Sequence, residues 1–175
     1  TDRKLRTTMN DQHEELDISG VKIAIIDDAK TIRMMMSHTL KGMGCEVECA
    51  EDGYKALGML RRFKPDLIFT HSKQDVHQDR NTMTDEALRA FRGITVLGFD
   101  VVRSSYGFFP HFLVEVTEED VNKKIEALSK YETYRDRYYF NSELTRSIMV
   151  RHGALAERPF AEGFDILRIV GTFEG

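Results

Sequence analysis

Residues 64–80 read KPDLIFTHSKQDVHQDR, so an apolar strand pattern is followed at once by a loop rich in histidine and aspartate. The run DLIFT at 66–70 has the length and composition of a buried strand. In parallel α/β sheets, ligands bind at the carboxyl ends of the strands. The segment therefore predicts a sheet and also the edge of that sheet where polar side chains gather.

The sequence before this segment has the alternation of strands and helices that such a sheet needs. The run VKIAII at 21–26 is continuously apolar, as in a parallel strand covered on both faces. Residues 29–42 place apolar side chains at helical spacing. A second amphipathic helix is indicated by Tyr54, Leu57 and Leu60. This order predicts an α/β fold with a doubly wound (Rossmann or flavodoxin-like), mostly parallel sheet in three αβα layers.

The second half of the chain continues the alternation. Thr84 is placed to cap a short helix whose first turn carries Asp85 and Glu86. Further strands are expected at 94–102, 111–116 and 164–170, with helices from 117 and at 142–156. We expect residues 21–175 to form a single α/β domain behind a flexible N-terminal extension at 1–20.

Composition narrows the class of partner. The net charge of -4 comes from 25 basic and 29 acidic residues that are mixed along the chain, so no basic face for nucleic acid or membrane is expected. No apolar run reaches the ~20 residues that span a bilayer. A cytoplasmic protein is the expectation, and the sequence leaves the homo-oligomeric state open.

Two predicted strand ends carry polar residues. The first strand ends at Asp27 and Asp28, and the third is followed by His71, Asp75, His77 and Asp79. Right-handed crossovers make these two strands neighbours. Carboxylates that face imidazoles can hold a divalent ion or divide acid and base roles. The alternative is that the acidic pair only caps the next helix and the loop is merely solvated.

Residues 21–70 resemble the receiver domains of two-component response regulators, particularly those of the twitching-motility type, through the segments VKIAIIDDAKTIR, GCEVECAEDGYKAL and KPDLIFT. In that family an acidic pair binds Mg²⁺ beside an aspartate that accepts a phosphoryl group. The resemblance implies that Asp27 and Asp28 are the acidic pair and that His71 stands at the phosphoacceptor position. The family's Met-Pro and Asp-Gly loop and its later Lys-Pro are missing.

From residue 64 the chain resembles the PIG-L family of zinc-dependent N-deacetylases, which act on N-acetylglucosamine-type sugars and related amides. The match runs through KPDLIFTHSKQDVHQDR, EALRAFRGITVLGFDV, FLVEVTEEDVNKKIEAL and RHGALAERPFAEGFDILRIVG, which is most of residues 64–171. The resemblance implies a small amide or sugar ligand and a zinc-bound water as nucleophile.

The first motif of that family is His-Pro-Asp-Asp, and its register falls on residues 25–28. The resemblance implies that Asp27 is the general base and Asp28 a zinc ligand. Ile25 stands where the family has a histidine ligand, so one ligand is replaced by an apolar side chain.

The later His-x-x-His motif is also altered. The resemblance implies that His77 stabilises the tetrahedral intermediate, whereas Arg80 stands at the second histidine, which binds zinc in the family. A permanent cation at this position repels Zn²⁺. His71 and Asp79 remain as candidate substitute ligands.

We interpret the chain as a recombined or designed α/β chimera with a receiver-like half at 21–70 and a PIG-L-like half at 71–175, which forms a structural scaffold without a complete catalytic site. A natural fusion is the other origin. Two alternative functions stay open: a zinc-dependent N-deacetylase and a phosphorelay receiver. We expect no cofactor, and Zn²⁺ or Mg²⁺ are the candidates if one is bound.

Overall fold

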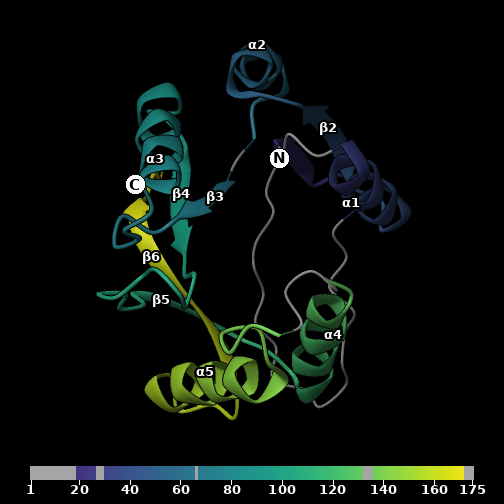
Figure 1. The fold of residues 1–175 in the computed structure, drawn as a ribbon. Coiled ribbons are helices and arrows are strands. Elements are labelled where there is room, and N and C mark those ends of the chain that lie inside the picture. Colours follow the sequence, from purple (N-terminus) through teal and green to yellow (C-terminus); the bar gives the residue numbers. More distant parts are fainter. Residues whose placement is uncertain (1–18, 27–29, 66, 132–135, 172–175) are drawn as a thin grey trace, which may run out of the picture. The chain divides into compact units, whose positions relative to one another are not determined.

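The computed structural model describes residues 19–26, 30–65, 67–131 and 136–171. Its contacts divide the chain into two compact units, Thr1–Lys64 and Pro65–Gly175 (Figure 1). The flexible extension expected at 1–20 lies outside the described residues except for its last two. The single domain expected at 21–175 stays a prediction. The two units are defined by their internal contacts, and such contacts do not test whether each unit folds independently.

The first unit is a two-stranded parallel sheet with two helices. Its elements are β1 (Lys22–Ile26), α1 (Lys30–Gly42), β2 (Glu46–Ala50) and α2 (Gly53–Phe63). β1 pairs with β2 in a register that places Ile25 opposite Cys49. Both helices contact both strands. The predicted neighbour relation between the first and third strands stays a prediction, because β1 is paired with β2 alone among the described residues.

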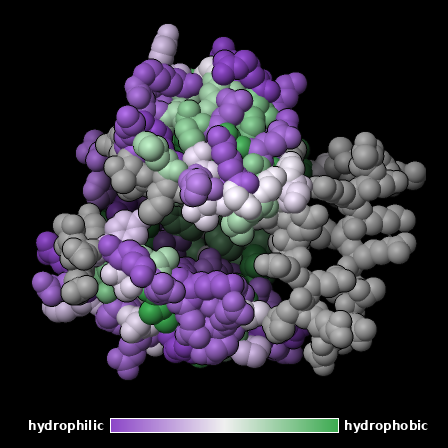
Figure 2. Space-filling view, turned by 90° about the vertical axis from the view of Figure 1, so that its right-hand side faces the viewer, coloured by the Kyte–Doolittle hydropathy of each residue, from purple (hydrophilic) through white to green (hydrophobic). Residues whose placement is uncertain are grey.

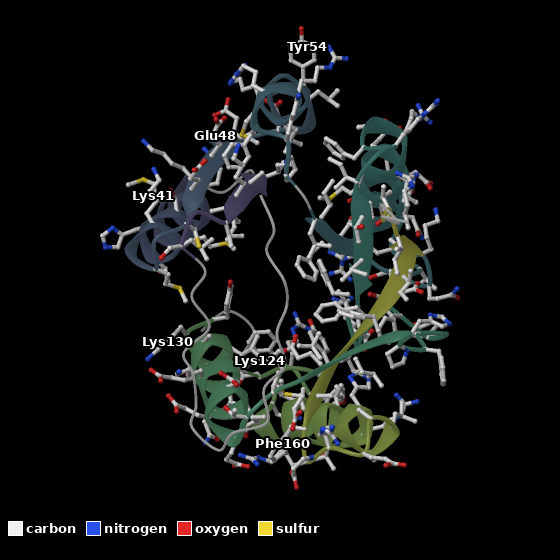
Figure 3. The ribbon with its side chains drawn as sticks, turned by 180° about the vertical axis from the view of Figure 1, so that it is seen from behind. Lys41, Glu48, Tyr54, Lys124, Lys130 and Phe160 are labelled. Atoms are coloured by element: carbon white, nitrogen blue, oxygen red, sulfur yellow. The ribbon has the colours of Figure 1, made fainter. Side chains whose placement is uncertain are left out.

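The helix α2 buries a different face from the one that the sequence indicated. Leu60 is buried as expected, but Tyr54 is 88% exposed and projects away from the helix (Figure 3). The buried side chains are Ala56, Met59, Leu60 and Phe63. They follow the i, i+3, i+4, i+7 spacing of a single helical face, and Tyr54 lies outside that stripe.

In its described residues, the second unit contains four strands and three helices. Its elements are β3 (Leu67–His71), α3 (Gln78–Ala90), β4 (Thr95–Phe99), β5 (Phe112–Glu115), α4 (Glu118–Ser129), α5 (Ser142–Leu155) and β6 (Ala161–Arg168). The strand order is β3-β4-β6-β5. β3 and β4 are parallel, whereas β6 runs antiparallel to both β4 and β5.

The mixed α/β class is thus confirmed, but the doubly wound, mostly parallel sheet is not. A single crossover helix returns the chain to the starting edge of a sheet and produces a parallel strand. Here two helices, α4 and α5, follow one another and contact each other before β6 begins (Figure 1). The second helix reverses the path, so β6 enters the sheet antiparallel to β4.

The helix after the polar loop begins earlier than expected. α3 starts at Gln78, so Thr84 lies in the middle of the helix and does not cap it. The side chain of Thr84 is buried, and its Oγ1 donates to the carbonyl oxygen of His71 at 2.8 Å. It also lies 3.2 Å from the hydroxyl of Thr70. Thr84 therefore ties α3 to the end of β3, which a capping residue cannot do.

The face shown in Figure 2 is largely hydrophilic, with hydrophobic residues exposed in small patches. The larger exposed apolar residues include Met34, Phe69 and Ile169. Among the described residues, no helix has both the length and the apolar character to cross a membrane.

Candidate functional site

The candidate site residues divide between described and undescribed parts of the chain. Asp27 and Asp28 lie outside the described residues, so their expected roles as base and metal ligand stay predictions. His71, His77 and Asp79 all belong to the second unit, at the end of β3 and the start of α3.

His71 is the last residue of β3 and is half-buried. Its ring packs against Phe99 of the neighbouring strand, with 4.6 Å between ring centroids. Burial lowers the pKa of His71 below its usual 6.5, and the nearby charge of Arg80 lowers it further. Nδ1 is buried and has no hydrogen-bond partner among the described residues. The imidazole is therefore neutral at neutral pH and retains one unused hydrogen-bonding nitrogen.

His77 and Asp79 have less protected positions. His77 is the N-cap residue of α3 but makes no side-chain cap, and its side chain is exposed. Its backbone nitrogen donates to Oδ1 of Asp75 at 2.8 Å. Asp79 is exposed in the first turn of α3, where its charge suits the helix dipole. Neither residue contacts His71 through an observed hydrogen bond.

The buried centre of the loop is Asp75, whose side chain has no exposed surface. Arg80 donates from Nη1 to Oδ2 of Asp75 at 3.1 Å and to Oγ of Ser104 at 2.6 Å. Ser104 in turn donates to Asp75 Oδ2 at 3.0 Å. Asn81 donates from its side-chain nitrogen to the Asp75 carbonyl. The carboxylate and its partners form a closed network.

Electrostatics agree with this arrangement. Burial would raise the pKa of Asp75, but hydrogen bonds from the His77 backbone, the Ser104 hydroxyl and the Arg80 guanidinium outweigh it and hold the pKa below its usual value. Asp75 is thus ionised and already neutralised by Arg80. The guanidinium of Arg80 and the carboxylate of Asp75 are therefore paired with each other and not available to a ligand.

The described residues do not fit a metal ion. They contain no group of three or more histidine, cysteine or acidic side chains close enough to hold one. From the first turn of α3, Arg80 places a permanent positive charge against Asp75 in the loop, which opposes a divalent cation. The chemistry that a Zn²⁺ ion supplies is therefore not assembled from these residues.

A second polar connection crosses β4 and joins the residue after β3 to β6. Ser72 donates to Oδ2 of Asp165 at 3.0 Å, while His111 Nδ1 lies 3.1 Å from Oδ1 of the same carboxylate. The carboxylate stands between the hydroxyl and the imidazole, so the histidine cannot take a proton from the serine directly. A Cβ at Gly98 would come within 2.9 Å of Ser72 Cα, so only glycine permits this close approach.

The second unit also contains a cavity of about 380 Å³ beside Arg80. It extends from the end of β4 to α4, α5 and β6. Asp100, the residue that follows β4, lines it, and burial raises the pKa of this carboxyl above its usual value. Sequence reasoning missed Asp100 and Ser104. Asp100 fell inside the strand expected at 94–102, whereas β4 ends at Phe99, and Ser104 carried no signal of its own. The polar interruption after the buried run at 94–99 was the available signal.

Comparisons with known proteins cover the two halves unequally. No family model matches the chain. A 50-residue segment, 29% of the chain, is 44% identical to Protein PilG of Pseudomonas aeruginosa. The chain spans 37% of the length of PilG, so the match supports a receiver-like segment and does not extend to the whole protein.

A similarity in fold covers much more of the chain. The crystal structure of the conserved protein TT1542 from Thermus thermophilus aligns with a TM-score of 0.61 over 88% of this chain and 84% of that one. The sequence identity is 15%, so the comparison concerns the fold alone. It supports the mixed α/β class.

Proposed function

We propose that this protein is a non-catalytic α/β scaffold, a chimera in which a receiver-like segment is joined to a mixed-sheet unit whose polar loop is closed by an internal ion pair. The role is structural: the loop holds β3, α3 and the segment around Ser104 together. The segment similar to PilG supports the receiver-like part. The PIG-L-like origin of the second part rests on the sequence resemblance.

The observation that carries the proposal is the position of Arg80. Its guanidinium is hydrogen-bonded to buried Asp75 and to Ser104, so this carboxylate is not available as a general base or a metal ligand. An unpaired carboxylate in a buried position raises the free energy of the folded state, so the ion pair is expected to stay intact. The loop that resembled an active site is, on this proposal, a structural connection.

Metal analysis and a zinc titration test the proposal. The full chain, purified without chelator or affinity metal, is expected to contain no stoichiometric zinc and to take up none at micromolar concentration. It is also expected to release no acetate from N-acetylglucosamine. One zinc per chain together with acetate release would replace the scaffold by a zinc-dependent N-deacetylase, with Asp27 as the candidate base and Asp28, His71 or Asp79 as candidate ligands.

A second candidate function is a phosphorelay receiver, which the similarity to PilG favours. His71 stands at the phosphoacceptor position of the resemblance, and its unused, neutral imidazole nitrogen is chemically able to accept a phosphoryl group. Incubation with acetyl phosphate and Mg²⁺ is expected to leave the scaffold unmodified. Incorporation of phosphate that is lost in a His71→Ala variant would favour the receiver.

A further inference from the structure

We propose that the cavity of the second unit binds a small zwitterion, namely a free α-amino acid with an apolar side chain, whose ammonium group is held by Asp100 and whose carboxylate is held by Arg103. This ligand site goes beyond the scaffold role and does not depend on it.

The cavity has the size and the walls of a small-molecule site. Its volume of about 380 Å³ falls within the range of about 300–1,000 Å³ that is typical of ligand pockets. Its apolar wall includes Phe99, Leu128, Phe140, Ile148, Met149 and Phe164. Such a wall accommodates an aromatic or aliphatic side chain and excludes a large polar one.

Most of the charged side chains that line the cavity are already neutralised. Arg80 is paired with Asp75, as described above. Lys124 reaches from α4 toward β6 (Figure 3), and its Nζ lies 2.6 Å from Oε1 of Glu162. His152 also lines the cavity, and burial lowers its pKa, so the ring is neutral at neutral pH. The lining charges that remain are Asp100 and Arg103.

The half-buried carboxylate of Asp100 is only partly satisfied, because among the described residues no cation forms an ion pair with it. Oδ1 is buried and accepts no hydrogen bond in the part of the chain that the structure describes. The nearby Ser105 hydroxyl favours the charged form of the carboxylate, but burial outweighs it and raises the pKa. Buried polar atoms in native proteins are paired in the great majority of cases. An ammonium group in the cavity would supply a cation for this carboxylate.

Arg103 is held at the cavity by an aromatic side chain. Its guanidinium lies 5.4 Å from the centroid of the Tyr139 ring, and Nη1 lies 3.4 Å from the tyrosine hydroxyl. The described residues place no carboxylate within ion-pair distance of it. A guanidinium that is stacked on an aromatic ring is pre-organised to bind a planar carboxylate with two parallel hydrogen bonds.

The pair of unmatched groups determines the class of ligand. Asp100 and Arg103 are three residues apart and line the same cavity, yet they do not form a salt bridge with each other in the structure. A ligand with only an ammonium group would pair with Asp100 but be repelled by Arg103. A ligand with only a carboxylate would pair with Arg103 but be repelled by Asp100. A molecule that carries both charges close together satisfies both groups, and an α-amino acid is the smallest common one.

Calorimetric titration of the full chain with three matched probes tests the site. The probes are L-phenylalanine, 3-phenylpropanoate and 2-phenylethylamine, which share the same apolar body and carry both charges, the carboxylate alone or the ammonium alone. L-phenylalanine is expected to bind at least about tenfold more tightly than either of the others, because each loses one charge-assisted hydrogen bond. Equal binding of all three, or none at millimolar concentration, would overturn the proposal.

Two variants assign the contacts. Asp100→Asn and Arg103→Gln keep the size of each side chain, and each is expected to weaken L-phenylalanine binding at least about tenfold. The matched controls are Asp85→Asn and Arg92→Gln, exposed residues that do not line the cavity, and both should bind as the unmodified protein does. Arg103 is exposed, so Arg103→Gln still decides the matter if Asp100→Asn disturbs folding. Unchanged affinity in Arg103→Gln would refute the proposed carboxylate contact.

Discussion

Nη1 of Arg80 lies 3.1 Å from Oδ2 of Asp75, and the side chain of this aspartate has no exposed surface. The two residues are five positions apart in sequence, so the pair joins the middle of the polar loop to the first turn of α3. Ser104 adds a third member from a distant segment. The pair therefore stabilises the second unit. It also keeps the Asp75 carboxylate from acting as a base or a metal ligand.

Arg80→Ala should destabilise the protein by about 3 kcal/mol, because it leaves an unpaired carboxylate in a buried position. The measurement is the free energy of unfolding from urea denaturation of the full chain. Arg89→Ala is the matched control: Arg89 Nη1 lies 3.3 Å from Glu86 Oε1 in a surface-exposed pair, for which a loss of about 0–1 kcal/mol is expected. Similar losses in both variants would contradict a buried, stabilising pair.

The acid dependence of stability should change in Asp75→Asn. The folded state holds the pKa of Asp75 below its usual 3.8, so this group contributes stability above that pH and loses it as the pH falls through the folded pKa. The variant lacks this titration. Its free energy of unfolding, measured between pH 5 and pH 2, should therefore fall less steeply with acid than that of the unmodified chain, and an identical slope would count against the assignment.

Asp100→Asn should stabilise the unliganded protein at pH 7, by less than about 1 kcal/mol. Burial raises the pKa of Asp100 in the folded state, so its stabilising contribution is present below the usual 3.8 and is lost as the pH rises through the folded pKa. The effect should disappear at pH 3. Comparison of urea denaturation at the two pH values checks the sign, and a loss of stability at pH 7 would show that the folded state stabilises the charged carboxylate.

Gly98→Ala should destabilise the second unit by about 1–3 kcal/mol. An added Cβ would lie 2.9 Å from Ser72 Cα and 3.3 Å from Asp165 Cβ, so Ser72 and β6 would have to move away from β4. Gly93→Ala is the control, because nothing lies within 4 Å of its added Cβ. Thermal denaturation of both variants measures the difference, and equal melting temperatures would mean that the close approach does not constrain the sheet.

Arg80→His should bind zinc more tightly than the unmodified chain. The change removes a cation, releases Asp75 and places two imidazoles three residues apart at the start of α3, together with His77. Zinc titration by calorimetry should show binding at least about tenfold tighter than in Arg80→Gln, which removes the charge but adds no ligand. If both variants bind zinc equally, the loss of repulsion by Arg80 would by itself explain why they bind zinc more tightly than the unmodified chain, and the added imidazole would not be a ligand.

The candidate site could be predicted from the sequence in outline only. The start of the loop after β3 was predicted correctly, but its end was not, because α3 begins at Gln78. His71 ends β3, His77 ends the loop, and Asp79 lies in the first turn of α3. The sequence did not predict the hydrogen bond from Ser104 to Asp75, two residues that are 29 positions apart. No spacing rule connects these two positions, and the same holds for the pairing of Ser72 with Asp165 across 93 residues.

By itself, the sequence determined the mixed α/β class and the places of its main strands and helices, because these depend on apolar periodicity within about ten neighbouring residues. Only the tertiary structure decided the direction of β6, the buried face of α2 and the start of α3. It also decided that Asp75 is neutralised by Arg80 and that, among the described residues, Oδ1 of Asp100 is buried without a hydrogen-bond partner. These features depend on which distant segments exclude water from a side chain, and local pattern carries no information about that.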